Sequence, residues 1–182
     1  MLTRRSVRSF ADAPVTVAEA GQLLWAAQGV TDSARGYRTA PSAGALYPLE
    51  VYLIAERVTG LSAGVYRYLP QAHALAGISA SSARQELYEA VLSQPAVLDA
   101  PAVLVFSGVF ERTTRKYGER GKQYVFLEAG HAAQNVYLQA TALGLGAVVI
   151  GAFDDDAVRR AVGMTSQEQP VYVMPFGQTD AE

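Results

Sequence analysis

The stretch Arg38–Glu56, RTAPSAGALYPLEVYLIAE, divides into two unlike halves. Its second half contains Leu49–Ala55, which is apolar on both of its alternating faces and predicts a strand buried in the middle of a sheet. Its first half, APSAGALYP, has small residues, two prolines and one tyrosine where an ordinary connection would have polar turn residues. The small side chains predict that another group comes close to the backbone just before the strand begins.

Other segments supply the elements that surround this strand. The capping box Thr16–Glu19 predicts the start of a helix that Gly29 ends. Further expected strands are 65–68, 74–78, 102–110, 147–153 and 170–176, and further expected helices are 82–92, 124–143 and 154–162. Because helices and strands do not alternate strictly, we expect an α+β fold with helices packed around one mostly antiparallel sheet.

The composition indicates a single domain, 1–182, with enough apolar residues for a sizeable core. Half of the residues are apolar and 18% are charged, and the net charge of -2 gives no reason to expect nucleic acid. The absence of cysteine excludes disulfides and thiolate metal sites and is typical of a reducing compartment. No apolar run reaches the roughly 18 residues that a membrane helix needs. We therefore expect a cytoplasmic protein with no membrane and no metal.

The opening RRSVRSF gathers basic residues. Arg4 and Arg8 would share a face if the segment were helical, and Arg5 and Ser6 add further donors. Guanidinium groups match phosphate oxygens, so the segment is a candidate phosphate site. A solvated basic terminus is the alternative, and spacing alone does not decide between the two.

The segment GLGAVVIGAF, 144–153, contains two glycines at dinucleotide-site spacing but not the third. It also runs from helix to strand, whereas a Rossmann turn runs from strand to helix, so a Rossmann NAD site is not expected. Gly151 inside an apolar run predicts either a bulge or the close approach of a flat group. A helix end followed by a core strand explains the segment equally well.

The segment 111–124, ERTTRKYGERGKQY, is expected to be an exposed loop that could overhang a cleft. Lys116 and Tyr117 place an amine beside a phenol, and both groups can transfer protons when their surroundings tune them. The alternative is solvated surface. Glu128 and His131 lie three residues apart on a helix and are expected to bond to each other in a structural role.

Four segments in this order resemble the nitroreductase-like flavoproteins: RRSVRSF, APSAGALYPLEVYL, LEAGHAAQNVYLQATALGLGAVVIGAF and PVYVMPFG. More narrowly, they are similar to the SagB-type dehydrogenases, which include the oxidases of thiazole/oxazole-modified peptide synthetases. Where typical nitroreductases have asparagine and glutamine, this sequence has Ala45 and Tyr47, which matches the SagB-type pattern better.

The resemblance implies a homodimer that binds FMN at the subunit interface. The phosphate and ribityl chain would be held by Arg4, Arg5 and Ser6, with Arg8 at the N1/O2 edge of the flavin. The ring would be lined by Pro41, Ser42, Ala43, Gly44 and Tyr47 of the partner subunit. Its other side would meet Val149, Ile150 and Gly151, with their backbone N–H groups toward N5 and O4.

The function implied is FMN-dependent oxidation of a small molecule or a modified peptide, with hydride passing between substrate and flavin N5. Lys116 and Tyr117 resemble the Lys-Tyr pair that acts in azoline oxidation and would then be catalytic. An NAD(P)H-dependent nitro or quinone reductase is an alternative in which NAD(P)H is the electron donor. A flavin-binding module without turnover is a second alternative.

Overall fold

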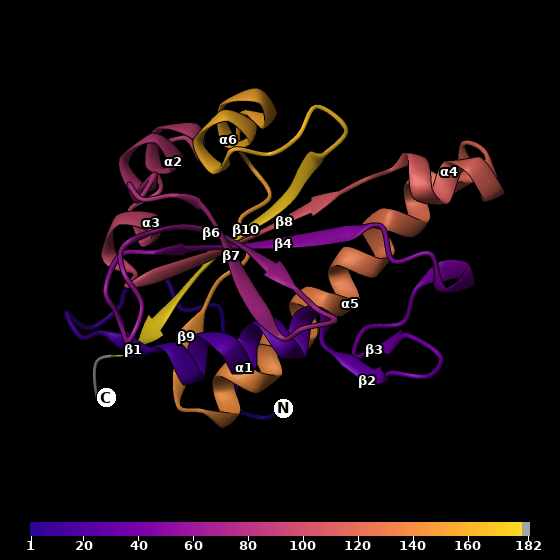
Figure 1. Ribbon diagram of the computed structural model, residues 1–182. Coiled ribbons are helices and arrows are strands. Elements are labelled where there is room, and N and C mark those ends of the chain that lie inside the picture. Colours follow the sequence, from indigo (N-terminus) through magenta and orange to yellow (C-terminus); the bar gives the residue numbers. More distant parts are fainter. Residues whose placement is uncertain (180–182) are drawn as a thin grey trace.

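The computed structural model describes residues 1–179, and the last three residues of the predicted domain lie outside this part. Its centre is a six-stranded sheet of order β7-β6-β4-β8-β10-β9, in which every neighbouring pair is antiparallel (Figure 1). The strands are β4 (Leu49–Ala55), β6 (Gly64–Leu69), β7 (Ala74–Ser79), β8 (Ala102–Gly108), β9 (Leu145–Ala147) and β10 (Gln169–Gln178). The predicted α+β fold is confirmed.

Helices cover both faces of the sheet. They are α1 (Val17–Gln28), α2 (Arg84–Ala90), α3 (Ala96–Asp99), α4 (Glu111–Tyr117), α5 (Arg120–Ala142) and α6 (Asp155–Val162). Helices α1 and α5 lie on one face and α2, α3 and α6 on the other, while α4 extends beyond the end of the sheet (Figure 1).

Alternation along the central strands produces the two cores. Leu53 of β4 and Leu104 of β8 pair in register and face α1 and α5, whereas Ile54 and Val103 face α2 and α6. All four side chains are buried. The apolar pattern of Leu49–Ala55 therefore predicted the central strand correctly, with both of its bounds.

Helix α1 begins as its capping box predicts, with Thr16 accepting from the Glu19 amide and Glu19 accepting from the Thr16 amide. Asp154 also caps α6 as expected, since its Oδ1 accepts from the Ala157 amide at 2.7 Å. The helix expected at 82–92 is shorter, because α2 begins at Arg84 after Ala83, an N-cap that makes no side-chain hydrogen bond.

Two further expectations are wrong. The charged segment 111–124 forms α4 and the first turn of α5 instead of a loop. The strand expected at 147–153 ends at Ala147, and beyond it only Ile150 makes an isolated bridge, to Val173.

Small elements complete the structure. β1 (Val15–Thr16) pairs with β5 (Val58–Thr59), β2 (Val30–Asp32) pairs with β3 (Tyr37–Arg38), and a 3-10 turn spans Ala43–Ala45. Among the described residues, no helix combines the length and apolar character that crossing a membrane requires.

Candidate functional site

The segment Arg38–Tyr47, here called the site loop, has an unusual backbone. Gly44, Ala45 and Tyr47 have φ angles of 64°, 55° and 45°, all in the left-handed region. For residues other than glycine this conformation costs about 1–2 kcal/mol each. Strain of this kind persists only where surrounding contacts hold it, and such places are often functional.

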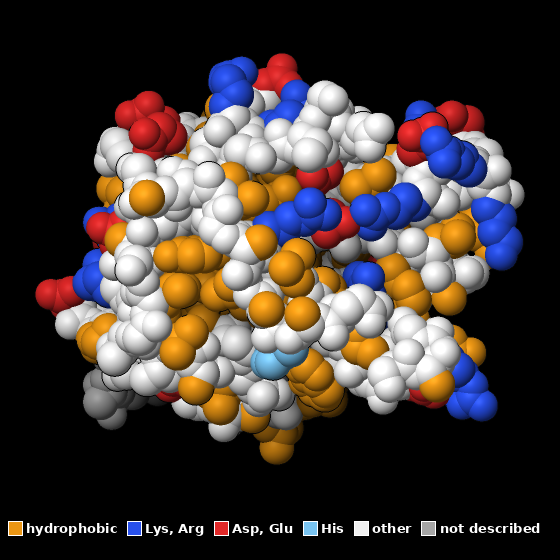
Figure 2. All heavy atoms as spheres, in the orientation of Figure 1, with side chains coloured by type: hydrophobic (Ala, Val, Ile, Leu, Met, Phe, Trp, Pro, Cys, Tyr) orange, Lys and Arg blue, Asp and Glu red, His pale blue; other side chains and the backbone are white. Residues whose placement is uncertain are grey.

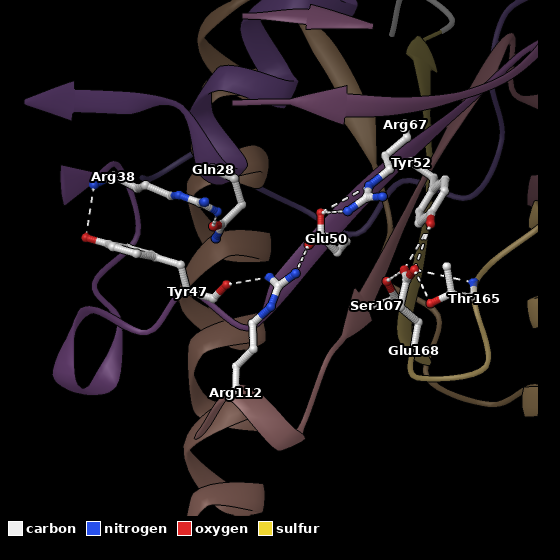
Figure 3. Close-up of polar contacts among 10 residues, drawn as sticks. All are labelled: Gln28, Arg38, Tyr47, Glu50, Tyr52, Arg67, Ser107, Arg112, Thr165 and Glu168. Carbon is white, nitrogen blue, oxygen red and sulfur yellow. Dashed lines mark hydrogen bonds and ion pairs between the residues drawn. The ribbon is translucent and has the colours of Figure 1, made fainter. Parts of the chain in front are cut away.

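Tyr47 is held at three points. Its backbone N–H donates to Ser42 Oγ at 2.8 Å, its carbonyl accepts from Arg112 at 3.0 Å, and its phenol oxygen accepts from the Arg38 amide at 3.2 Å. The Arg38 guanidinium also lies 4.6 Å from the centre of the Tyr47 ring. These contacts fix the end of the site loop where it enters β4 (Figure 3).

Glu50 joins the site loop to its neighbours. Its carboxylate pairs with Arg112 of α4 at 2.6 Å and with Arg67 of β6 at 2.9 Å. Figure 3 shows both guanidinium groups pointing at this carboxylate from different elements. On the face drawn in Figure 2, basic and acidic atoms lie side by side in a band across the middle and do not form a patch of one sign. This arrangement does not favour a polyanion such as nucleic acid.

The site loop also meets the Lys-Tyr pair. A Cβ placed on Gly44 would lie 2.7 Å from Tyr117 Oη and 2.8 Å from Lys116 Nζ, closer than real contacts allow. A side chain at position 44 would therefore require the end of the Lys116 or Tyr117 side chain to move. The structure thus brings together two features that the sequence places more than 70 residues apart: the small-residue stretch and the amine-phenol pair.

Glu128 of α5 lies buried under the site loop, with only 3% of its surface exposed. Burial raises the pKa of Glu128 to about 7, although the Ser42 hydroxyl and the Arg38 charge both oppose the shift. Burial likewise lowers the pKa of Arg38. The expected bond to His131 is not formed, because His131 is exposed while Glu128 faces inward.

The N-terminal segment forms no helix, so the condition under which Arg4 and Arg8 would share a helical face is not met. Ser6 forms a parallel bridge with Ala147, and its hydroxyl lies 3.3 Å from Tyr137 Oη. The Arg4 guanidinium lies 5.2 Å from the Tyr137 ring. Arg4 and Ser6 therefore meet at Tyr137.

Arg5 belongs to the opposite face of this segment. Its guanidinium donates to the carbonyls of Leu2 and Arg4. With Val7 and Ser9, it lines an open cavity of about 800 Å³ beside β9. The structure therefore places Arg5 on the other side of the segment from Arg4 and Ser6, with which it was expected to hold the phosphate and ribityl chain.

The segment Val149–Gly151 lies beside Tyr137, but most of its amides are already bonded. Val149 N–H donates to Tyr137 Oη at 2.7 Å, and Ile150 N–H donates to the Val173 carbonyl at 2.8 Å. Only the Gly151 N–H has no partner among residues 1–179. The expectation that all three amides point at a ligand is corrected to Gly151 alone.

The expected site residues thus form two groups at different places on α5. The site loop lies over Glu128, and the N-terminal segment and Val149 meet at Tyr137. Nine residues of helix separate these positions, which is about 14 Å along its axis. No hydrogen bond or ion pair among the described residues joins the two groups directly.

Several residues that organise these groups were missed from the sequence. Arg38, Glu50 and Tyr137 received no role, and Arg112 was noted only as one of several charges in the segment 111–124. A buried carboxylate at the start of a strand was a signal for Glu50, because a charge there requires a partner. Tyr137 gave no signal, since an aromatic residue on a long helix is usually part of the core.

Comparison with known proteins identifies the family. The Nitroreductase family model matches residues 1–178. The chain belongs to the nitroreductase family. One relative is a protein from Methanocaldococcus jannaschii that is provisionally named as a nitroreductase. It is 47% identical over 178 residues, which is 98% of this chain and 88% of that protein.

Two further matches point to the predicted SagB-type branch. The microcin B17-processing protein McbC of Escherichia coli is 33% identical over 150 residues, which is 79% of this chain and 55% of that protein. A chain from the Escherichia coli microcin synthetase McbBCD complex with truncated pro-MccB17 bound superposes with a TM-score of 0.84 at 29% identity. The superposition covers 98% of this chain and 71% of the other. The predicted family and branch are confirmed.

Proposed function

We propose that the protein is an FMN-dependent dehydrogenase that oxidises an azoline ring in a modified peptide or a related small molecule. The observation that carries this proposal is the contact of Lys116 and Tyr117 with Gly44. It places two proton-transferring groups at the segment proposed to lie against the flavin ring. The likeness to McbC, which processes a peptide, favours a peptide substrate. The absence of cysteine fits a cytoplasmic location.

The residues present fit FMN. Arg4, Arg5 and Arg8 have no acidic partner among residues 1–179, so their charges are available to an anion such as the FMN phosphate. We assign the phosphate to Arg4 and Ser6, with Arg5 and Arg8 in the same segment. The Gly151 amide would donate to the ring edge. Pro41, Ser42, Ala43, Gly44 and Tyr47 would line the ring.

When bound, FMN would accept the hydride that leaves the substrate and would later pass its electrons to oxygen or another acceptor. The protein's own part is to hold the substrate carbon against the site loop and to receive the proton. We assign that role to Lys116 or Tyr117, both of which reach the loop from one turn of α4. Arg112 holds the same helix against the loop through the Tyr47 carbonyl and Glu50.

The site also requires a second subunit in this proposal. The two groups of site residues lie about 14 Å apart on one α5, so a second α5 running the opposite way would bring one group of each subunit together. Phe126 and Leu127 of α5 are 54% and 57% exposed, and Trp25 of the adjacent α1 is 36% exposed. Exposed apolar side chains on neighbouring helices favour an interface. A homodimer with two sites is therefore part of the proposal.

An NAD(P)H-dependent nitro or quinone reductase is the second candidate. It is favoured by the 47% identical relative from Methanocaldococcus jannaschii, which is named as a nitroreductase. A flavin-binding module without turnover is a third candidate.

One experiment separates the three. The purified protein is loaded with FMN and mixed without oxygen with a thiazoline-containing peptide or with NADPH, while flavin absorbance is followed. We expect the peptide to bleach the flavin and NADPH to leave it oxidised. Bleaching by NADPH alone would establish the reductase, and no bleaching by either would leave a binding module. A protein that retains no FMN once free FMN has been removed would refute the whole proposal.

A further inference from the structure

Beneath the site loop lies a polar cluster whose bonding is incomplete. Gln28 Oε1 of α1 accepts a hydrogen bond from Arg38 at 2.9 Å. The charge of Arg38 in turn favours the ionised form of Glu128 of α5. Each of the three side chains keeps a buried polar atom without a partner among residues 1–179: Gln28 Nε2, Arg38 Nε and Glu128 Oε1. Buried polar groups are normally satisfied, so an incomplete cluster at one place calls for an explanation.

Ser42 connects this cluster to the strained part of the site loop. Its oxygen accepts the Tyr47 N–H at 2.8 Å, and its hydroxyl lies close enough to the Glu128 carboxylate to favour the ionised form. Ser42 is followed by Ala43 and Gly44, and Lys116 and Tyr117 lie against Gly44.

We propose that Glu128 is a positioning residue for the flavin site: its carboxylate holds Ser42 and Arg38, and its ionisation sets both the rigidity and the net charge of the site loop. With Glu128 ionised, Arg38 and Glu128 together are neutral and Ser42 has a charged acceptor. With Glu128 protonated, the pair carries one positive charge and Ser42 loses that acceptor. This inference rests on the proposed function where it concerns flavin.

The charges around the cluster allow this change to occur near neutral pH. Burial raises the pKa of Glu128 to about 7, and of the charged groups Arg38 acts most directly against the shift. On Arg38 itself, Glu50 of β4 and Tyr47 of the loop favour the charged form, while Arg112 of α4 disfavours it. The remaining neighbour from α1, Gln28, is neutral.

The first test does not depend on flavin. Trp25 is the single tryptophan, and its carbonyl accepts from the Thr39 hydroxyl at 3.0 Å, one residue from Arg38. Its emission in the full chain without added FMN is followed from pH 5.5 to 8.5. We expect a transition with a midpoint near 7 in the wild type and none in Glu128→Gln, which keeps the shape but cannot ionise. A flat wild-type curve, or a transition that persists in Glu128→Gln, would overturn the proposal.

The matched control is Glu168→Gln. Glu168 is 2% exposed and accepts from Tyr52, Ser107 and Thr165, in a hydrogen-bonded set that includes no residue of the site loop. We expect this variant to keep the transition near pH 7. Loss of the transition in Glu168→Gln as well would show a general effect of removing a buried carboxylate and would count against the assignment to Glu128.

The second test uses FMN itself. A charged acceptor strengthens a hydrogen bond by about 1 kcal/mol over a neutral one, which corresponds to about fivefold in affinity. We expect Glu128→Gln to bind FMN about fivefold more weakly than the wild type at pH 8 and equally at pH 6. Equal affinities at both pH values would refute the link to flavin. If neither protein binds FMN, the proposed function fails, and the Trp25 titration alone decides the role of Glu128.

Discussion

Replacing Gly44 with alanine tests whether the site loop and the Lys-Tyr pair act together. Two effects are expected. The first is backbone strain, since a left-handed alanine costs about 1–2 kcal/mol. In a domain of this size, each kcal/mol lowers the melting temperature by about 2–4 °C. The second effect is displacement of Lys116 and Tyr117, whose end atoms lie within 2.8 Å of the new Cβ.

The displacement can be estimated from the geometry. Restoring an ordinary separation of about 3.5 Å moves the Tyr117 hydroxyl or the loop by about 0.8 Å. A misplacement of about 1 Å at a reacting centre reduces turnover by about 100-fold. We therefore expect Gly44→Ala to retain FMN and lose about two orders of magnitude in oxidation of a thiazoline peptide.

Gly36→Ala is the matched control, because Gly36 has a similar φ of 71° and no atom lies within 4 Å of its Cβ position. Both variants carry the same backbone strain, and only Gly44→Ala disturbs Lys116 and Tyr117. Melting temperature, FMN affinity and turnover are measured for both. If the two variants have equal turnover, the contact at Gly44 has no catalytic role and the reasoning fails.

Three more predictions concern other parts of the site. Arg4→Ala is expected to weaken FMN binding more than Arg115→Ala, because Arg115 is occupied by Glu111 on the surface; equal affinities by fluorescence titration would contradict the phosphate assignment. Leu127→Glu is expected to shift the dimer to monomer in sedimentation. The control Leu92→Glu, which is also exposed but remote from α5, is expected to leave the mass unchanged. A monomeric wild type with FMN bound would rule out the interface. The raised pKa of Glu128 means that the folded state binds its proton more tightly than the unfolded state. The stability from this group is therefore lost as pH rises from about 4.5 to about 7, by about 3 kcal/mol in all. Urea unfolding at pH 5 and pH 8 should show this slope in the wild type and not in Glu128→Gln.

Local sequence signals predicted the centre of the fold well. Leu49–Ala55 is apolar at every position but Glu50, and the capping boundary at Thr16 depends on residues within one turn. Such features require no knowledge of distant contacts. The family resemblance supplied the identity of the site segments, and composition alone had indicated only that something approaches the backbone near Gly44.

Distant contacts explain the main errors. The segment 111–117 is charged and lacks apolar periodicity, yet it is helical because Arg112 is tied to Tyr47 and Glu50 and Thr113 is buried against Gly121. Likewise, Val149 does not continue a strand because its N–H donates to Tyr137 Oη. In both cases the deciding partner lies in another element of the structure, so the pattern within the segment did not contain it.

Helix α5 connects the two halves of the proposed site in a way that neither half shows alone. Ala45 and Tyr47 together store about 2–4 kcal/mol of backbone strain. That strain is held by the bonds of Tyr47 to Arg112 of α4 and to Ser42, and Ser42 lies beside Glu128 of α5. The same helix fixes the N-terminal segment and Val149 through Tyr137. If each flavin lies between the Tyr137 end of one subunit and the Glu128 end of the other, every site depends on both α5 helices. A shift of one α5 along the interface would therefore alter both sites at once, so occupancy of the first site should change the affinity of the second.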